Sequence, residues 1–141
     1  MASASKFNAF SEHVSEKVHN LGSDTLMNML TNTAPVATNS LYGDLTEISA
    51  GNGYTAKGGQ AVQSSSAQSS GTYKLVLADV TFTASGGSIG PFRYTALFND
   101  TPTSPADPLI LSWDYGTNLT LTTGNSFTID YDATNGVLTL A

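Results

Sequence analysis

The sequence predicts an all-β protein, a β-sandwich or jelly roll of about eight antiparallel strands preceded by one short N-terminal amphipathic helix. Apolar and polar residues alternate in short runs from residue 24 onward, and Gly, Asn, Pro or Asp breaks separate these runs. Helical spacing occurs only near the N-terminus. The 141 residues fit one folded unit. We therefore expect an N-terminal arm and helix over 1–22 and a single β-sandwich domain over 23–141.

The expected helix is defined by apolar residues that recur at spacings of three and four and so form one stripe. Gly22 follows the stripe and supplies a C-terminal stop. A helix this short is not stable alone. Its apolar face must therefore dock, either on the sandwich or on a partner or sister subunit. The stripe is formed by Phe7, Phe10, Val14, Val18 and Leu21.

The first part of the β region predicts two short strands and a polar edge. Strands are expected at 25–31 (TLMNMLT) and 44–49 (DLTEIS), and the second runs into the turn signal Gly51-Asn52-Gly53. The segment 60–71, QAVQSSSAQSSG, is rich in Ser and Gln. It is expected to form a polar edge strand or a long loop within the domain.

The second part gives stronger strand signals. Alternation changes phase at Ala78-Asp79, which predicts a bulge or bend between two strands. The run 92–99 predicts a half-buried strand with Phe92, Tyr94, Ala96 and Phe98 on one face. In 109–115, Leu109, Leu111, Trp113 and Tyr115 are expected on one side of a strand that ends at Gly116. Further strands are expected at 118–123, 126–131 and 137–140.

Charge and composition narrow the function classes. Lys and Arg number 5 against 11 Asp and Glu, and no basic residue follows Arg93, so we expect no nucleic-acid partner. No segment approaches the ~20 apolar residues of a membrane span, and the N-terminus shows no export signal. We therefore expect a soluble product with no membrane partner. The chain has no cysteine, so thiolate metal sites and disulfides are absent.

The candidate catalytic groups are few. His13 and His19 are the only histidines, and on a helix they would point ~240° apart, which disfavours a shared metal site. Asp130 and Asp132 share one face of a strand end, expected to be the solvated one. The segment 130–136 (DYDATNG) departs from a calcium loop because Asn135 stands where that loop needs glycine. We expect a non-enzyme with no catalytic residue, metal site or cofactor.

The segment 112–116, SWDYG, holds the only tryptophan and allows two interpretations. Aromatic rings beside a carboxylate would suit a sugar-binding platform if Trp113 and Tyr115 were exposed. The alternation with Leu109 and Leu111 instead places both rings in the core and Asp114 outside. We favour the core.

Five segments resemble a widespread group of small structural proteins of tailed bacteriophages. They are TNTAPVATN, EISAGNGYTAKGG, GSIGPFRYTALFNDT, PLILSWDYG and IDYDATNGVLTL, which together follow the chain from about residue 31 to its end. The resemblance implies a short N-terminal helical segment followed by a β-sandwich or jelly roll. It also implies a place in the virion, as a capsid decoration (cement) protein or as a tail- or fibre-associated component. It implies no catalytic residues.

From this resemblance we expect a decoration protein on the outer capsid surface. It would bridge neighbouring major capsid protein subunits, stabilise the head, and form a dimer or trimer at a symmetry position. The helix face of Phe7, Phe10, Val14 and Val18 is the expected contact with the capsid or a sister subunit. A tail- or fibre-associated protein with an adsorption role is one alternative, and a carbohydrate-binding module is another.

Overall fold

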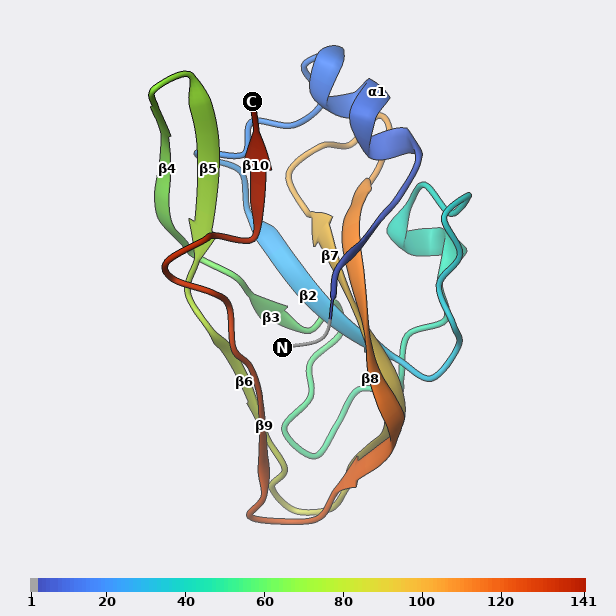
Figure 1. Ribbon diagram of the computed structural model, residues 1–141. Helices are drawn as coiled ribbons and strands as arrows, with labels where there is room; N and C mark the ends of the chain where they lie inside the picture. The colour runs from blue at the N-terminus through green and yellow to red at the C-terminus, as the bar shows by residue number, and fades with distance from the viewer. Residues whose placement is uncertain (1–2) are drawn as a thin grey trace.

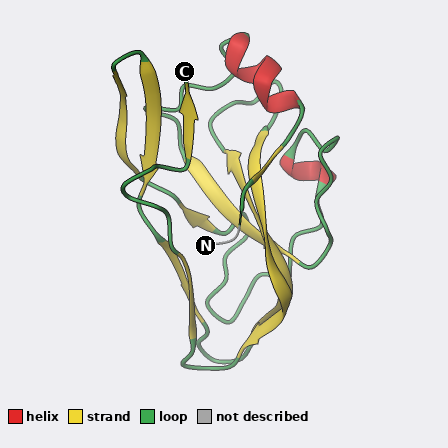
Figure 2. Cartoon of the chain, in the orientation of Figure 1, coloured by secondary structure: helices red, strands yellow, loops and turns green. Residues whose placement is uncertain are grey.

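A computed structural model describes residues 3–141 and has the predicted all-β architecture. Within this range there are ten strands, one α-helix and one 3-10 turn (Figure 1; Figure 2). The N-terminal elements are β1 (Ser5–Lys6), α1 (Ala9–Ser15), β2 (Leu26–Thr31) and the 3-10 turn Tyr42–Asp44. The strands that follow are β3 (Gly59–Gln60), β4 (Gln63–Ser69), β5 (Thr72–Leu77), β6 (Val80–Thr83), β7 (Ile89–Asn99), β8 (Leu109–Leu121), β9 (Ser126–Ile129) and β10 (Leu138–Leu140).

The strands form two layers of antiparallel sheet. One layer is a five-stranded sheet in the order β1-β8-β7-β2-β3, in which β7 and β8 are the longest strands. The other layer consists of a three-stranded sheet, β10-β5-β4, and the pair β6-β9. Figure 1 shows these two small sheets one above the other, facing β2, β7 and β8. The polar segment 60–71 was predicted to be an edge strand or a long loop, and the edge strand is confirmed, because β4 lies within it at the edge of its sheet.

The second layer is bent where the sequence changes phase. Leu77 ends β5 and Val80 begins β6, and both side chains are buried, which confirms the predicted bend at Ala78-Asp79. On the partner side, residues 130–137 separate β9 from β10. The Asp79 carboxylate accepts a hydrogen bond from the Tyr131 backbone N–H at 2.9 Å. The bend is therefore fastened to the loop that lies opposite.

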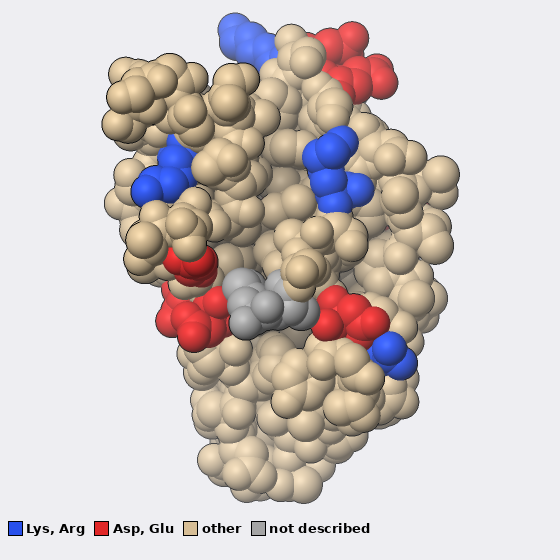
Figure 3. Space-filling view, viewed as in Figure 1, with Lys and Arg blue, Asp and Glu red and all other residues tan. Residues whose placement is uncertain are grey.

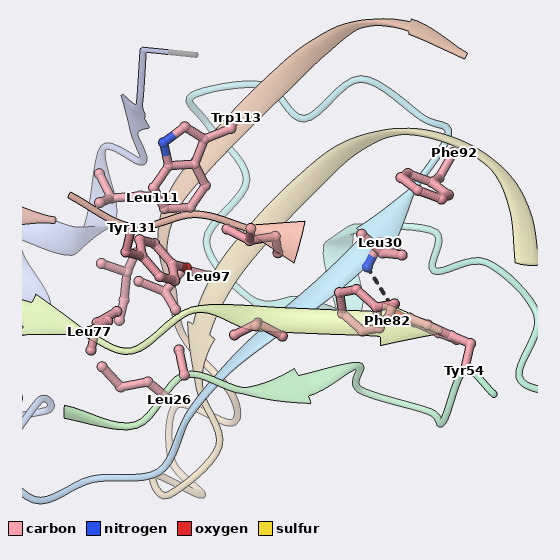
Figure 4. Close-up of a cluster of buried hydrophobic side chains, with 14 of the residues drawn as sticks. Leu26, Leu30, Tyr54, Leu77, Phe82, Phe92, Leu97, Leu111, Trp113 and Tyr131 are labelled. Atoms are coloured by element: carbon pink, nitrogen blue, oxygen red, sulfur yellow. Dashed lines mark hydrogen bonds between the residues drawn. The ribbon is translucent and has the colours of Figure 1, made fainter. Parts of the chain in front are cut away.

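The main hydrophobic core lies between the two layers (Figure 4). Trp113 packs edge-on against Tyr131, with ring centroids 5.7 Å apart. The buried Tyr54 hydroxyl accepts a hydrogen bond from the Leu30 backbone N–H at 3.0 Å. Because both layers contribute to this core, it joins residues far apart in the sequence. Its largest members include Leu26, Leu30, Tyr54, Leu75, Phe82, Phe92, Leu97, Ile110, Trp113 and Tyr131.

A second, smaller core lies on the opposite face of the five-stranded sheet. It contains Phe7, Met29, Ala96, Phe98 and Leu109, and Tyr42 and Leu45 pack against it. These last two residues belong to the segment between β2 and β3, which covers that face. The strand predicted at 92–99 is confirmed as part of β7, but its predicted half-burial is wrong for residues 95–99, which are buried on both faces. The strand predicted at 44–49 is also wrong; only Glu47 makes an isolated bridge, to Thr31.

Irregular register alters the predicted pattern in β8. Leu97 pairs with Leu111 while the next residue, Phe98, pairs with Leu109, so Ile110 is an extra residue in a bulge. Leu109 consequently lies in the second core and Leu111 in the main core. The prediction that Leu109 shares a side with Leu111 and Trp113 is wrong because the bulge shifts the alternation by one residue.

The N-terminal helix is shorter than predicted. It ends at Ser15, and Lys17 adopts a left-handed backbone (φ 66°) that reverses the chain. Phe7 precedes the helix and lies in the second core, whereas Phe10 lies in the main core. Both are at most 5% exposed, and Val14 packs against the main core. The two phenylalanines are buried within their own chain, so they do not form the exposed contact face that was expected of them.

Candidate functional site

The best-formed cavity of the described residues is an aromatic cleft between the two layers, with a volume of about 300 Å³. Four consecutive residues of the β9 segment, 127–130, line one side. Residues 92–95 of β7 and two aromatic residues of β8, Trp113 and Tyr115, line the other. The cleft therefore opens beside β9, whose only strand neighbour is β6. Its volume is at the lower end of the range for small binding sites.

Five of the eleven residues that line the cleft are aromatic. Phe127 packs edge-on against Phe92 at 5.1 Å and against Tyr115 at 5.5 Å between ring centroids. Trp113 is 6% exposed, whereas Tyr115 is 54% exposed. The predicted core position is thus confirmed for Trp113 and wrong for Tyr115. A sugar platform that requires both rings to be exposed is not formed.

Tyr115 is exposed because β8 leaves regular pairing at this point. Asp114 lies opposite Tyr94, but the next paired residue on β8 is Leu119, opposite Phe92. Residues 115–118 therefore form a wide irregularity in which alternation no longer predicts which side chain is buried. Gly116 does not end the strand as expected, because β8 continues to Leu121.

An ion pair and a second carboxylate lie at the rim of the cleft. The Arg93 guanidinium donates two hydrogen bonds to the Asp114 carboxylate, at 2.8 and 3.0 Å. The Gly116 backbone N–H donates a third at 2.8 Å. Arg93 and, secondarily, Gly116 hold the pKa of Asp114 below its usual value. Asp130 also lines the cleft and is exposed.

The two histidines come together although they were expected to diverge. Because the chain reverses after α1, the rings of His13 and His19 lie 5.9 Å apart. The Nδ1 atom of the buried His19 lies 3.1 Å from the Asn99 side-chain nitrogen, and its Nε2 atom is buried without a protein partner. Burial, and secondarily the neighbouring His13, lowers the pKa of His19 to about 4. His19 is therefore a neutral core residue near pH 7.

A polar cluster fastens the long loop between β2 and β3. The Tyr42 and Tyr54 hydroxyls donate to the two oxygens of the Glu47 carboxylate, at 2.5 and 2.6 Å. Burial and the Glu47 hydrogen bond raise the pKa of Tyr42 to about 12. The same causes raise the pKa of Tyr54. Both tyrosines are therefore protonated donors at neutral pH, and they hold the loop through one carboxylate.

Lys57 connects this loop to the loop between β7 and β8. Its ammonium group contacts the carboxylates of Asp100 and Asp107, the latter at 3.0 Å. Hydrogen bonds from Lys57 to these two groups raise its pKa, so the lysine is charged and unsuited to act as a base. Sequence reasoning missed this cluster because its members are spread along the chain. They come together only because the loop between β2 and β3 folds beside the loop between β7 and β8.

The remaining candidate carboxylate, Asp132, has a structural role. Its carboxylate accepts hydrogen bonds from the backbone N–H groups of Thr134 and Asn135, each at 2.8 Å. These hydrogen bonds, chiefly those from Asn135, lower the pKa of Asp132. The segment 130–136 thus contains the predicted turn. Between residues 3 and 141, no group of three or more His, Asp or Glu side chains is placed to hold a metal ion.

The fold and the cleft define a class, an all-β sandwich with an aromatic cleft on one open side. No protein-family model, no curated protein and no solved structure matches this chain. Among the described residues, no helix has the length and apolar character needed to cross a membrane.

Proposed function

We propose that this chain is a tailed-bacteriophage virion protein of the capsid decoration class. It would bind the assembled shell on its outer surface, bridge neighbouring major capsid protein subunits and stabilise the head. Two things support the proposal: the resemblance of five segments to small phage structural proteins, and an uncharged end of the sandwich. The second is the observation that carries it.

The uncharged end consists of residues 80–92 and 115–129, which contain no Asp, Glu, Lys or Arg. These residues form β6, β9 and the adjoining parts of β7 and β8. In Figure 3 this end is the lower part of the molecule, where the visible surface carries no coloured side chains. Exposed hydroxyl groups pair across β6 and β9, with Thr81 2.9 Å from Thr128 and Thr83 2.8 Å from Ser126.

An uncharged, hydrogen-bonding surface is suited to contact with a protein lattice. The centres of protein interfaces are depleted in charged residues, and hydroxyl groups can pair with polar groups of the shell. Many copies can also lie close together without strong mutual repulsion at this end. Weak individual contacts then add up by avidity, and binding only to the assembled lattice stabilises it by mass action.

The test is to add purified protein to shells that lack it and to count the bound copies. A decoration protein occupies on the order of hundreds of positions and raises the temperature at which the shell disrupts. Thr81→Lys with Thr128→Lys places two charges on the uncharged end and is expected to reduce binding. Ser65→Lys with Gln68→Lys, on exposed positions of β4, is the matched control. A handful of copies confined to the tail would instead indicate the tail- or fibre-associated alternative.

The oligomeric state is part of this proposal. Closed dimers and trimers dominate symmetric assemblies, and either would suit a symmetry position on a shell. Light scattering of the purified protein and copy counting on the shell check this independently. A monomer in solution that also binds the shell singly would contradict the dimer or trimer.

A further inference from the structure

We propose that the aromatic cleft binds an extended peptide segment of a partner protein, which adds as a strand to the free edge of β9. An apolar side chain of that peptide enters the cleft between Tyr115 and Phe127. The inference concerns the cleft alone and holds whether the protein sits on a capsid or a tail.

The first support is the free edge of β9. Strand pairing places β9 beside β6 only, so its other edge has no strand neighbour among the described residues. All four residues from Phe127 to Asp130 line the cleft. Consecutive residues of a strand point to alternate faces, so a cavity that reaches all four lies along the strand edge. Unpaired backbone groups on such an edge are templates for an added strand.

The second support is β1, which is already an added strand on the same side of the sandwich. Ser5 and Lys6 pair antiparallel with Ser112 and Leu111 at the edge of β8. Beyond these two pairs, β8 continues to Leu121 without a strand neighbour on that edge among residues 3–141. On this open side, the first part of β8 is thus paired with the extended segment β1, and the cleft lies beside the later, unpaired part of β8.

The third support is the chemistry of the cleft. Phe92, Trp113 and Phe127 provide apolar walls, and Tyr115 is half exposed at the mouth. Burying a peptide's apolar side chain against these rings is favourable. The Trp113 ring is too buried to serve as a stacking face for a sugar. A strand, in contrast, would use both the rings and the backbone groups of β9.

The charges at the rim of the cleft favour a peptide that has a positively charged residue beside its apolar residue. Asp114 is ion-paired with Arg93, but Asp130 is exposed at the end of β9. No basic residue follows Arg93 in the chain. A Lys or Arg in the incoming peptide would therefore meet a negative field, which added salt should weaken.

The test is an NMR titration of the ¹⁵N-labelled protein with a synthetic peptide, acetyl-Thr-Lys-Thr-Phe-Thr-Val-Thr-amide. Saturable shift changes are expected for the β9 segment 126–130 and for Tyr115, with fewer changes elsewhere. The same peptide with methyl groups on the alternate backbone nitrogens that would face β9 cannot donate to that edge, so its affinity should fall at least about tenfold.

Single substitutions test the apolar and the charged parts of the cleft separately by their effect on peptide affinity. Tyr115→Ser should weaken binding about fivefold or more, whereas Val36→Ser, which removes an exposed apolar side chain outside the cleft, should not. Asp130→Asn should weaken the Lys-containing peptide but not its Gln analogue. Saturation without shifts in 126–130, or equal affinity for the methylated peptide, would overturn the proposal. So would no binding at millimolar peptide, or a disaccharide such as cellobiose producing the same shifts and displacing the peptide.

Discussion

Trp113 and Tyr115 show how two residues on one strand can have different environments. Trp113 lies opposite Thr95 in regular pairing and is held against Tyr131. Tyr115 lies two residues further, in the irregular part of β8, where its ring packs edge-on against Phe127. The pleat orients the first ring, and the loss of pairing releases the second toward solvent.

Trp113→Ala is expected to lower the free energy of unfolding by about 3–5 kcal/mol, because it leaves a cavity beside Tyr131 in the main core. Urea denaturation followed by circular dichroism measures this, since the variant has no tryptophan. Tyr115→Ala is the control on the same strand. Its exposed ring should contribute about 1 kcal/mol or less, and equal losses for the two variants would contradict the assignment.

His19 predicts a pH dependence of stability. The folded protein holds His19 neutral with a pKa of about 4, against an ordinary value of 6.5. Between these values the unfolded chain binds more protons, so the free energy of unfolding falls as the pH falls from 6.5 toward 4. The slope from this residue approaches about 1.4 kcal/mol per pH unit and vanishes above 6.5.

The measurement compares urea unfolding of the wild type and His19→Gln between pH 4 and 7. The difference between the two profiles gives the contribution of His19 alone. It removes the contributions of other groups that titrate in this range, including Asp24, which raises the pKa of His19, and His13, which lowers it. A difference that stays constant from pH 6.5 to 4 would show that His19 is accessible to protons in the folded state.

At the scale of elements, the loop between β2 and β3 has no regular strand of its own and depends on specific contacts. The Glu47 carboxylate holds two parts of the loop together through Tyr42 and Tyr54. Lys57 connects the loop to the one between β7 and β8. The loop then returns to β2 through a close backbone approach at Gly58. A Cβ atom there would lie 1.8 Å from the Asn28 carbonyl oxygen, so only glycine allows β3 to pair with β2.

Gly58→Ala is therefore expected to be strongly destabilising, by more than about 3 kcal/mol, because it adds a backbone clash to left-handed strain. Gly71→Ala is a matched control. Gly71 has nearly the same backbone angle (φ 84° against 81°), but open space surrounds its Cβ position. It should lose only about 1 kcal/mol. Thermal unfolding of both variants checks the difference, and similar losses would mean that the loop can shift away.

At the scale of the whole molecule, the N-terminal arm connects the two cores. Phe7 lies in the second core, Phe10 and Leu21 lie in the main core, and β7 contributes to both. The arm over 1–22 is therefore packed into the sandwich from Phe7 onward, which is one of the two docking modes expected for its apolar face. Of the four residues expected at a partner contact, only Val18 lies outside both cores, where it lines an open hollow and is half-buried.

Phe7→Ala and Phe10→Ala should each lower the free energy of unfolding by about 3–5 kcal/mol within one cooperative transition. Trp113 fluorescence reports on the main core, and circular dichroism reports on all strands. The two signals should give the same midpoint in both variants. Separate midpoints in Phe7→Ala would show that the second core unfolds independently.

Local patterns in the sequence were sufficient for the fold class, the polar edge strand, the bend at Ala78-Asp79 and the burial of Trp113. Alternation and turn residues act between neighbours along the chain, so these features can be read without the partner strands. The same reasoning predicted the turn at 130–136, where the Asp132 carboxylate accepts hydrogen bonds from the backbone N–H groups of Thr134 and Asn135.

Only the tertiary structure decided which faces are covered and where pairing becomes irregular. The bulge at Ile110 and the irregular stretch 115–118 are set by register with β7, which no local pattern encodes. Likewise, residues 95–99 of β7 are buried on both faces because the loop of residues 32–58 folds over them. The cleft exists for the same reason: β9 pairs with a strand on one side only, and its free edge lies near the buried Trp113 and the exposed Tyr115 of β8.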